Sequence, residues 1–303
     1  MDNLKSRFWH NFALVTLLSL ALLIIGTILG QLCTLPISYL LNKISIFNLH
    51  QSFYLMFLSL FSCLFVSLIF CLWVRFIEKQ PLSFIGFVKD HWLTKYLTGL
   101  LIGFAMMSIV VIILLVSGHI SLEKNNIQPT GISSLPFILI LLIGWIIQGA
   151  SEEIVTRGYL MNVLKNKYNV PVALLITSTL FGLLHLGNPG VNAIAIINII
   201  LVGLFFGLCT IKTNNLWLAC GIHSAWNFAQ GNIFGFEVSG IDTSVGSLID
   251  LNLKGNTLIT GGAFGPEAGL SSTIVLILSI GIILYLDKKG TFQKVIENKS
   301  IAK

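Results

Sequence analysis

Charged residues are scarce in this sequence. Only 10% of its 303 residues are Asp, Glu, Lys or Arg, whereas 55% are hydrophobic. A soluble domain usually carries roughly a quarter charged residues. So little charge cannot cover a water-facing surface, which argues against a soluble protein. The composition therefore predicts an all-α polytopic membrane protein.

Cysteine pairs and the common zinc-protease motif are also missing. The five cysteines are scattered, mostly within apolar runs, and none forms a C-x-x-C pair. We interpret them as small apolar residues at helix interfaces rather than as disulfides or metal ligands. No H-E-x-x-H sequence occurs, and there is no internal repeat or linker to a soluble domain. The chemistry must come from other residues.

Long apolar runs are abundant. A membrane-spanning helix needs ~20 mostly apolar residues. The first run follows Lys5 and Arg7 as a signal peptide would, but it is too long and lacks a small-residue cleavage pattern, so we expect it to be retained. The chain has about eight such runs, at approximately residues 12–32, 53–74, 96–117, 135–157, 170–187, 193–211, 215–232 and 271–286.

The basic residues are distributed unevenly around these runs. If both termini are cytoplasmic, 15 of the 18 Lys and Arg residues lie on the cytoplasmic side, and only Lys43, Lys124 and Lys254 lie outside. Such a bias follows the positive-inside rule and predicts this orientation. Because the bias also accounts for the net charge of +6, we predict no nucleic-acid partner.

The order of the runs divides the chain into four parts. We predict three N-terminal helices in residues 1–134, a core of helices four to seven in 135–232, an external loop in 233–270, and the last helix with a basic cytoplasmic tail in 271–303. The loop is net acidic and contains eight glycines. This composition indicates an outer cap or a re-entrant segment.

Ionisable residues inside the apolar runs are the most informative feature. They are costly in a bilayer and usually mark function. Each also has a structural interpretation, since a Glu–Arg pair can lock helices and an Asn can bond neighbouring helices. A cluster of them favours a functional site. They lie in the predicted core: Glu152, Glu153 and Arg157 in the fourth run, His185 in the fifth, and His223 and Asn227 in the seventh.

Helical spacing predicts which of these groups pair. Glu153 and Arg157 are four residues apart and share a face, with the acid before the base. Glu152 points ~100° away from its neighbour and should stay available. In an antiparallel hairpin that turns near Tyr168, Glu152 and His185 lie at the same level, ~24 Å from the turn.

A free carboxylate, two imidazoles and a carboxamide predict hydrolysis. A desolvated Glu152 can act as the general base for a water molecule that the imidazole opposite can hold or share. The second His and the Asn, on another helix, can donate hydrogen bonds to an oxyanion. The set Glu152, His185 and His223 also includes familiar zinc ligands. The sequence leaves both alternatives open, so no cofactor is certain and a divalent metal such as zinc is a candidate. Ser151 and Ser224 have no His–Asp relay, which disfavours a covalent nucleophile.

Three motifs on successive runs carry a family resemblance. They read Glu152-Glu153-x-x-x-Arg157, Phe181-x-x-x-His185 and His223-x-x-x-Asn227. On these motifs the chain resembles the CAAX-protease and bacteriocin-processing (CPBP) family, which includes the type II CAAX prenyl endopeptidases. The resemblance covers about residues 135–232, and the stretch 260–267 also looks like a segment of many bacterial members.

The resemblance implies an intramembrane endopeptidase in a bacterial cell membrane, acting on a membrane-associated peptide or protein. It implies that Glu152 and His185 activate the water and that His223 and Asn227 form the oxyanion hole. It implies supporting roles for Glu153, Arg157 and Phe181.

Two other functions stay open on the sequence. A non-catalytic member could use the same cavity to bind a peptide, confer bacteriocin immunity or act as a regulatory scaffold. A transporter with a proton relay is less favoured, because the chain shows no inverted repeats with helices broken at matching places.

Overall fold

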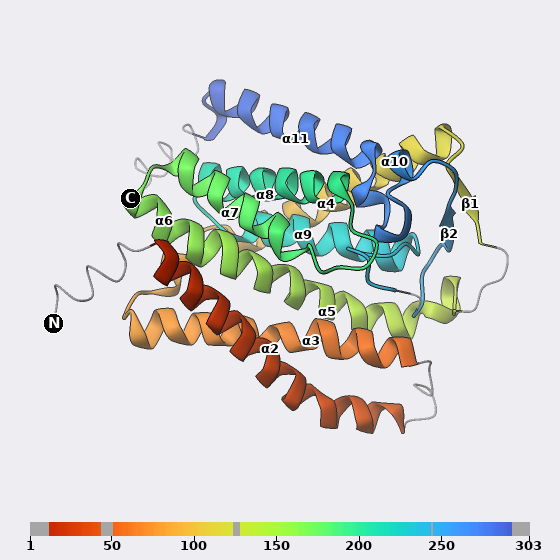
Figure 1. Ribbon diagram of the computed structural model, residues 1–303, viewed down its shortest axis with the longest axis horizontal. Coiled ribbons are helices and arrows are strands. Elements are labelled where there is room, and N and C mark those ends of the chain that lie inside the picture. Colours follow the sequence, from red (N-terminus) through yellow and green to blue (C-terminus); the bar gives the residue numbers. More distant parts are fainter. Residues whose placement is uncertain (1–11, 44–50, 124–127, 244, 293–303) are drawn as a thin grey trace.

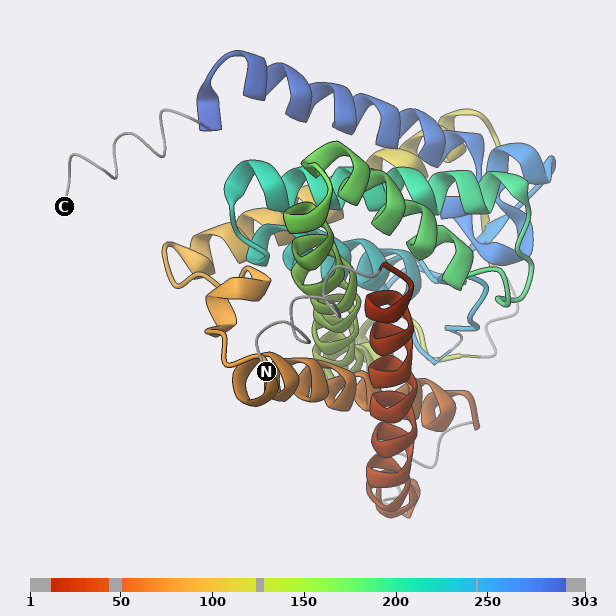
Figure 2. The same ribbon diagram turned by 60° about the vertical axis from the view of Figure 1, so that its left-hand side comes forward.

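The computed structural model describes residues 12–43, 51–123, 128–243 and 245–292, and these are almost entirely helical. The helices form a layered bundle (Figure 1). One helix, α2, crosses α3 at an angle and extends away from the others (Figure 2). The main helices are α2 (Phe12–Asn42), α3 (Gln51–Leu72), α4 (Trp92–Val116), α5 (Leu135–Glu153), α6 (Met161–Lys167), α7 (Val170–Leu184), α8 (Ala193–Thr213), α9 (Trp217–Phe228) and α11 (Leu270–Lys288).

The predicted all-α membrane fold is confirmed. Within the described residues, six helical segments are long and apolar enough to cross a membrane. Large apolar side chains such as Leu101, Ile112 and Leu278 are exposed on the outside of the bundle, as expected where lipid replaces water. The predicted spans at 170–187 and 215–232 correspond to the shorter helices α7 and α9, so eight is an approximate count.

The two ends of the bundle differ. The start of α2 and the end of α11 lie at the same end as α6 (Figure 1). This arrangement agrees with an even number of crossings, although the termini themselves, 1–11 and 293–303, lie outside the described residues. The opposite end carries β1 (Ile120–Leu122), β2 (Leu251–Leu253) and α10 (Thr257–Thr260).

The predicted external loop, 233–270, is folded into a cap at that opposite end. Strand β2 within it pairs antiparallel with β1, placing Ile120 opposite Leu253 and Leu122 opposite Leu251. Short 3-10 turns at Gly262–Phe264 and Pro266–Ala268 then lead into α11. The cap is therefore attached both to the α4–α5 connection and to the last helix.

Glycines bring α4 and α9 into close contact. A Cβ atom on Gly99 would lie 2.4 Å from the Leu218 carbonyl oxygen, and one on Gly103 would lie 2.2 Å from the Ile222 carbonyl oxygen. Small residues spaced by four allow this approach of two membrane helices. Because His223 follows Ile222 directly, the glycine contact fixes the position of the third motif.

Candidate active site

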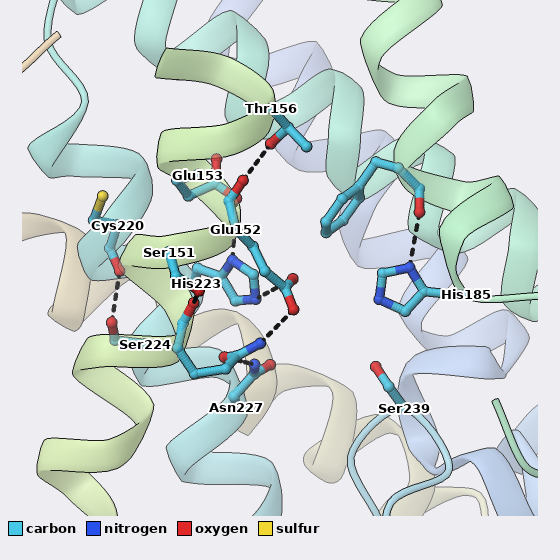
Figure 3. A network of polar contacts seen from close by, with 12 residues as sticks. Ser151, Glu152, Glu153, Thr156, His185, Cys220, His223, Ser224, Asn227 and Ser239 are labelled. Carbon is cyan, nitrogen blue, oxygen red and sulfur yellow. Dashed lines mark hydrogen bonds and ion pairs between the residues drawn. The ribbon is translucent and has the colours of Figure 1, made fainter. Parts of the chain in front are cut away.

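The candidate site is a cavity of about 290 Å³ among α3, α5, α7, α8, α9 and the cap. Most of its wall is apolar, with polar groups on two opposite sides (Figure 3). The four side chains predicted to carry the chemistry all line this cavity and come from α5, α7 and α9: Glu152, His185, His223 and Asn227.

The helix that carries the first motif changes its winding directly after the two glutamates. The α-helix ends at Glu153 and continues as a π-helical segment, Ile154–Leu160. Single π turns inside helices are frequent at functional sites. At this junction the side chain of Glu152 is 32% exposed, whereas that of Glu153 is fully buried. Only Glu152 is therefore open to the cavity.

Glu153 forms a fully buried ion pair with Arg157. Arg157 Nη1 donates to Glu153 Oε1 at 2.9 Å, and both side chains are inaccessible. The guanidinium also lies 4.3 Å from the centre of the Phe181 ring, within the range of a cation–π contact. The expected pairing is thus present, and Phe181 of the second motif packs against Arg157 of the first.

His223 lies between the two glutamates. Its Nδ1 is 3.1 Å from Glu153 Oε1, and because an ionised carboxylate only accepts, Nδ1 must carry the proton. Its Nε2 is 3.7 Å from Glu152 Oε2, which is too long for a direct hydrogen bond. The imidazole is therefore hydrogen-bonded to the buried carboxylate of Glu153 and faces the carboxylate of Glu152 in the cavity at a longer distance.

His185 occupies the opposite wall from Glu152 (Figure 3). It caps the C-terminus of α7 instead of lying within a longer helix, as the predicted span 170–187 implied. Its Nδ1 is 2.8 Å from the Phe181 carbonyl oxygen. A carbonyl can only accept, so this contact places the proton on Nδ1 and leaves Nε2 as an acceptor in the neutral ring.

Gln148 is a site residue that the sequence reasoning missed. Its Nε2 donates to Glu152 Oε1 at 2.7 Å, and its Oε1 accepts from Asn227 Nδ2 at 3.0 Å. It thereby connects the proposed base to the carboxamide of the third motif. A signal existed, since Gln148 precedes Glu152 by four residues and must share its helix face.

Glu267 is the second residue that was missed, and it brings another carboxylate to the cavity from the cap. Its Oε1 accepts from both the backbone N–H and the hydroxyl of Ser239. It is more than a hundred residues from Glu152 in sequence, so no helical period could relate the two.

The proposed zinc ligands do not come together as a metal site. In the described part of the chain, no group of three or more His, Cys, Asp or Glu residues is placed to hold a metal ion. Glu152 approaches His223, but His185 stands on the other wall. Zinc requires three protein ligands around one point. The described residues, as placed, do not fit that ion.

The hydroxyl groups of the two adjacent serines each donate a hydrogen bond to a backbone carbonyl of their own helix. The Ser151 hydroxyl donates to the Gln148 carbonyl oxygen at 2.8 Å. The hydroxyl of Ser224, which is fully buried, donates to the Cys220 carbonyl oxygen at 2.8 Å. Neither has the base that a covalent nucleophile needs.

Comparison with known families gives a match over the middle of the chain. Residues 134–229 match the family model described as type II CAAX prenyl endopeptidase Rce1-like. The range contains all three motifs and reaches from the start of α5 to the end of α9. None of the curated proteins and none of the solved structures matches this chain.

Proposed function

We propose that this chain is an intramembrane endopeptidase that uses Glu152 to activate water, in keeping with the match of residues 134–229 to the type II CAAX prenyl endopeptidase Rce1-like family model and with the resemblance predicted from its motifs. One observation carries the proposal. Of two neighbouring glutamates inside an apolar helix bundle, one is sealed in an ion pair and the other opens to a cavity with two histidines and an amide.

The first step is attack by water on the peptide carbonyl. Glu152 takes a proton from the water as its oxygen bonds to the carbonyl carbon. Gln148 holds the other carboxylate oxygen of Glu152 at 2.7 Å, which orients the base. His185, with Nε2 free to accept, holds the same water from the opposite wall.

The second step is stabilisation of the oxyanion. Asn227 gives one N–H to Gln148, and its second N–H is available to the developing charge. His223 acts beside it when Nε2 also carries a proton. In that state the carboxylates of Glu152 and Glu153 balance the positive charges of Arg157 and His223, so these four side chains together are electrically neutral. Collapse of the intermediate breaks the C–N bond, and Glu152 passes its proton to the leaving amine.

The proposed location is a bacterial cell membrane with both termini cytoplasmic. The exposed apolar faces of the bundle support a bilayer setting, and the charge bias of the sequence supports the orientation. A membrane-associated peptide or protein is the proposed substrate.

A cleavage assay in lipid nanodiscs tests the proposal. Purified wild type and the Glu152→Ala variant are incubated with a panel of membrane peptides, and products are identified by mass spectrometry. We expect peptides cut by the wild type and left intact by the variant. A wild type that binds peptides but cuts none would support the alternative of a binding, bacteriocin-immunity or scaffold protein.

A further inference from the structure

The cap holds Glu267 rigidly at the cavity. Buried Asn198 in α8 donates to the carbonyl oxygens of Glu267 at 2.7 Å and Gly269 at 3.0 Å. Ser272 donates to the Pro266 carbonyl oxygen at 2.8 Å. The backbone on both sides of Glu267 is thus fixed to two helices, so its carboxylate enters the cavity in a predetermined position.

Anchoring the cap does not require a charge at this position. Asn198 and Ser272 already bind the segment through its backbone. A glutamine oxygen would also accept both hydrogen bonds of Ser239, though more weakly than a carboxylate, and it would avoid the cost of burying a charge. That cost is present, because burial raises the pKa of Glu267, and the bonds from Ser239, the nearby His185 and a bond from Trp226 offset this effect only in part. The carboxylate therefore calls for a role that depends on its charge.

The ionisable side chain of the cavity that acts electrostatically on Glu267 is His185, and no permanently charged cation among the described residues accompanies it. The residues that line the cavity include two carboxylates, Glu152 and Glu267, but no Lys or Arg. Arg157 is fully buried and already paired with Glu153. Within the described chain, no Lys or Arg forms an ion pair with Glu267. Its neighbours from Ser239 are neutral donors, which satisfy its lone pairs without cancelling its charge.

We infer that Glu267 recognises a positively charged group of the substrate, an ammonium or guanidinium, at the end of the cavity formed by the cap. The inference rests on the proposed function, whose substrate class it specifies. The group is supplied by a Lys or Arg side chain or by a free amino terminus. A peptide with an acidic group at the same place is repelled, because it would bring a third negative charge into the cavity.

Binding is tested with the Glu152→Gln protein, which keeps the subsite without cleaving. One membrane peptide is prepared with Lys, Gln or Glu scanned through each position, with the amino terminus free or acetylated. We expect one position at which Lys binds about 10-fold more tightly than Gln, in line with a charge-assisted hydrogen bond. If the free amino terminus is the bound group, acetylation should weaken binding about 10-fold, and a Lys at any scanned position should bind no more tightly than Gln.

Matched variants identify the residue responsible. Adding Glu267→Gln should abolish the preference for the cationic peptide, and Glu267→Lys should transfer it to the acidic peptide. Glu237→Gln is the control, because Glu237 is an acidic residue of the same cap that does not line this cavity, and it should keep the preference.

The outcomes separate the subsite from the proteolysis. Equal affinity for cationic and neutral peptides at every position contradicts the subsite, and this result does not require any Glu267 variant to fold. An equal loss of affinity for all peptides in the Glu267→Gln variant contradicts it as well. Cleavage by wild type without any charge preference removes the subsite and leaves the protease. A charge preference in binding without any cleavage retains the subsite and removes the protease.

Discussion

At the scale of single residues, two adjacent glutamates have opposite environments. The spacing of Glu153 and Arg157 predicted their pairing, because partners four apart on a helix are determined locally. The contact of His223 with Glu153 joins residues 70 positions apart and depends on how α9 packs. Glu267 was beyond sequence reasoning for the same reason. The motifs therefore identified the groups, and the fold determined which of them meet.

Gln148 gives a test of the hydrogen bonds around the base. We expect Gln148→Leu to lower kcat by at least ~10-fold, because it removes two hydrogen bonds of about 1 kcal/mol each from Glu152 and Asn227. Steady-state kinetics in nanodiscs measure this effect. Ser151→Ala is the control on the same cavity wall, and it should keep kcat near wild type because its hydroxyl bonds the Gln148 carbonyl oxygen and Cys63 rather than Glu152 or Asn227. An unchanged kcat in Gln148→Leu, or a collapse in Ser151→Ala, contradicts these assignments.

At the scale of the elements, the helices were predictable, but the two that carry the second and third motifs are short. Helix α7 has 15 residues, and α9 has 12 before it continues as the π-helical segment Ala229–Ile233, close to the predicted end at 232. The residues of α9 from Ala219 to Asn227 are all buried in the protein. A helix surrounded by other helices does not have to match the thickness of the bilayer. The length of an apolar run in the sequence therefore predicts the lipid-facing helices better than it predicts the helices around the site.

The α4–α9 contact gives a prediction for a single added methyl group. Gly103→Ala would place Cβ 2.2 Å from the Ile222 carbonyl oxygen, so the helices must separate. We expect a loss of ~1–3 kcal/mol of stability, typical of overpacking, together with reduced activity because His223 moves with Ile222. Thermal unfolding and turnover measure the two effects.

Gly281→Ala is the matched control, since nothing lies within 4 Å of the added atom on α11. It should be neutral or stabilising by up to ~1 kcal/mol, because alanine is the better helix former. Equal melting temperatures for the two variants would show that the close contact does not exist.

At the scale of the whole molecule, the distribution of charge predicts the orientation in the membrane. The cap lies at the end of the bundle opposite α6 (Figure 1), where the sequence has few basic residues. In a background without Cys33, the exposed native cysteine, we expect Lys254→Cys to react with an impermeant maleimide added to intact cells. A cysteine at Lys294, outside the described residues, should react only after lysis. Reaction of the Lys294 site alone from outside would reverse the orientation.

The most direct test of the account compares Glu152→Gln with Glu153→Gln, by activity per folded molecule and by melting temperature. The first keeps the shape but cannot take a proton, so turnover should fall by at least ~10²-fold while the melting temperature stays near wild type. The second leaves the buried charge of Arg157 uncompensated and also removes the carboxylate that is hydrogen-bonded to His223. It should chiefly lose expression and stability, by roughly 3–5 kcal/mol. A Glu152→Gln protein that unfolds, beside a Glu153→Gln protein that is stable but inert, would contradict the assignment of Glu152 as the base.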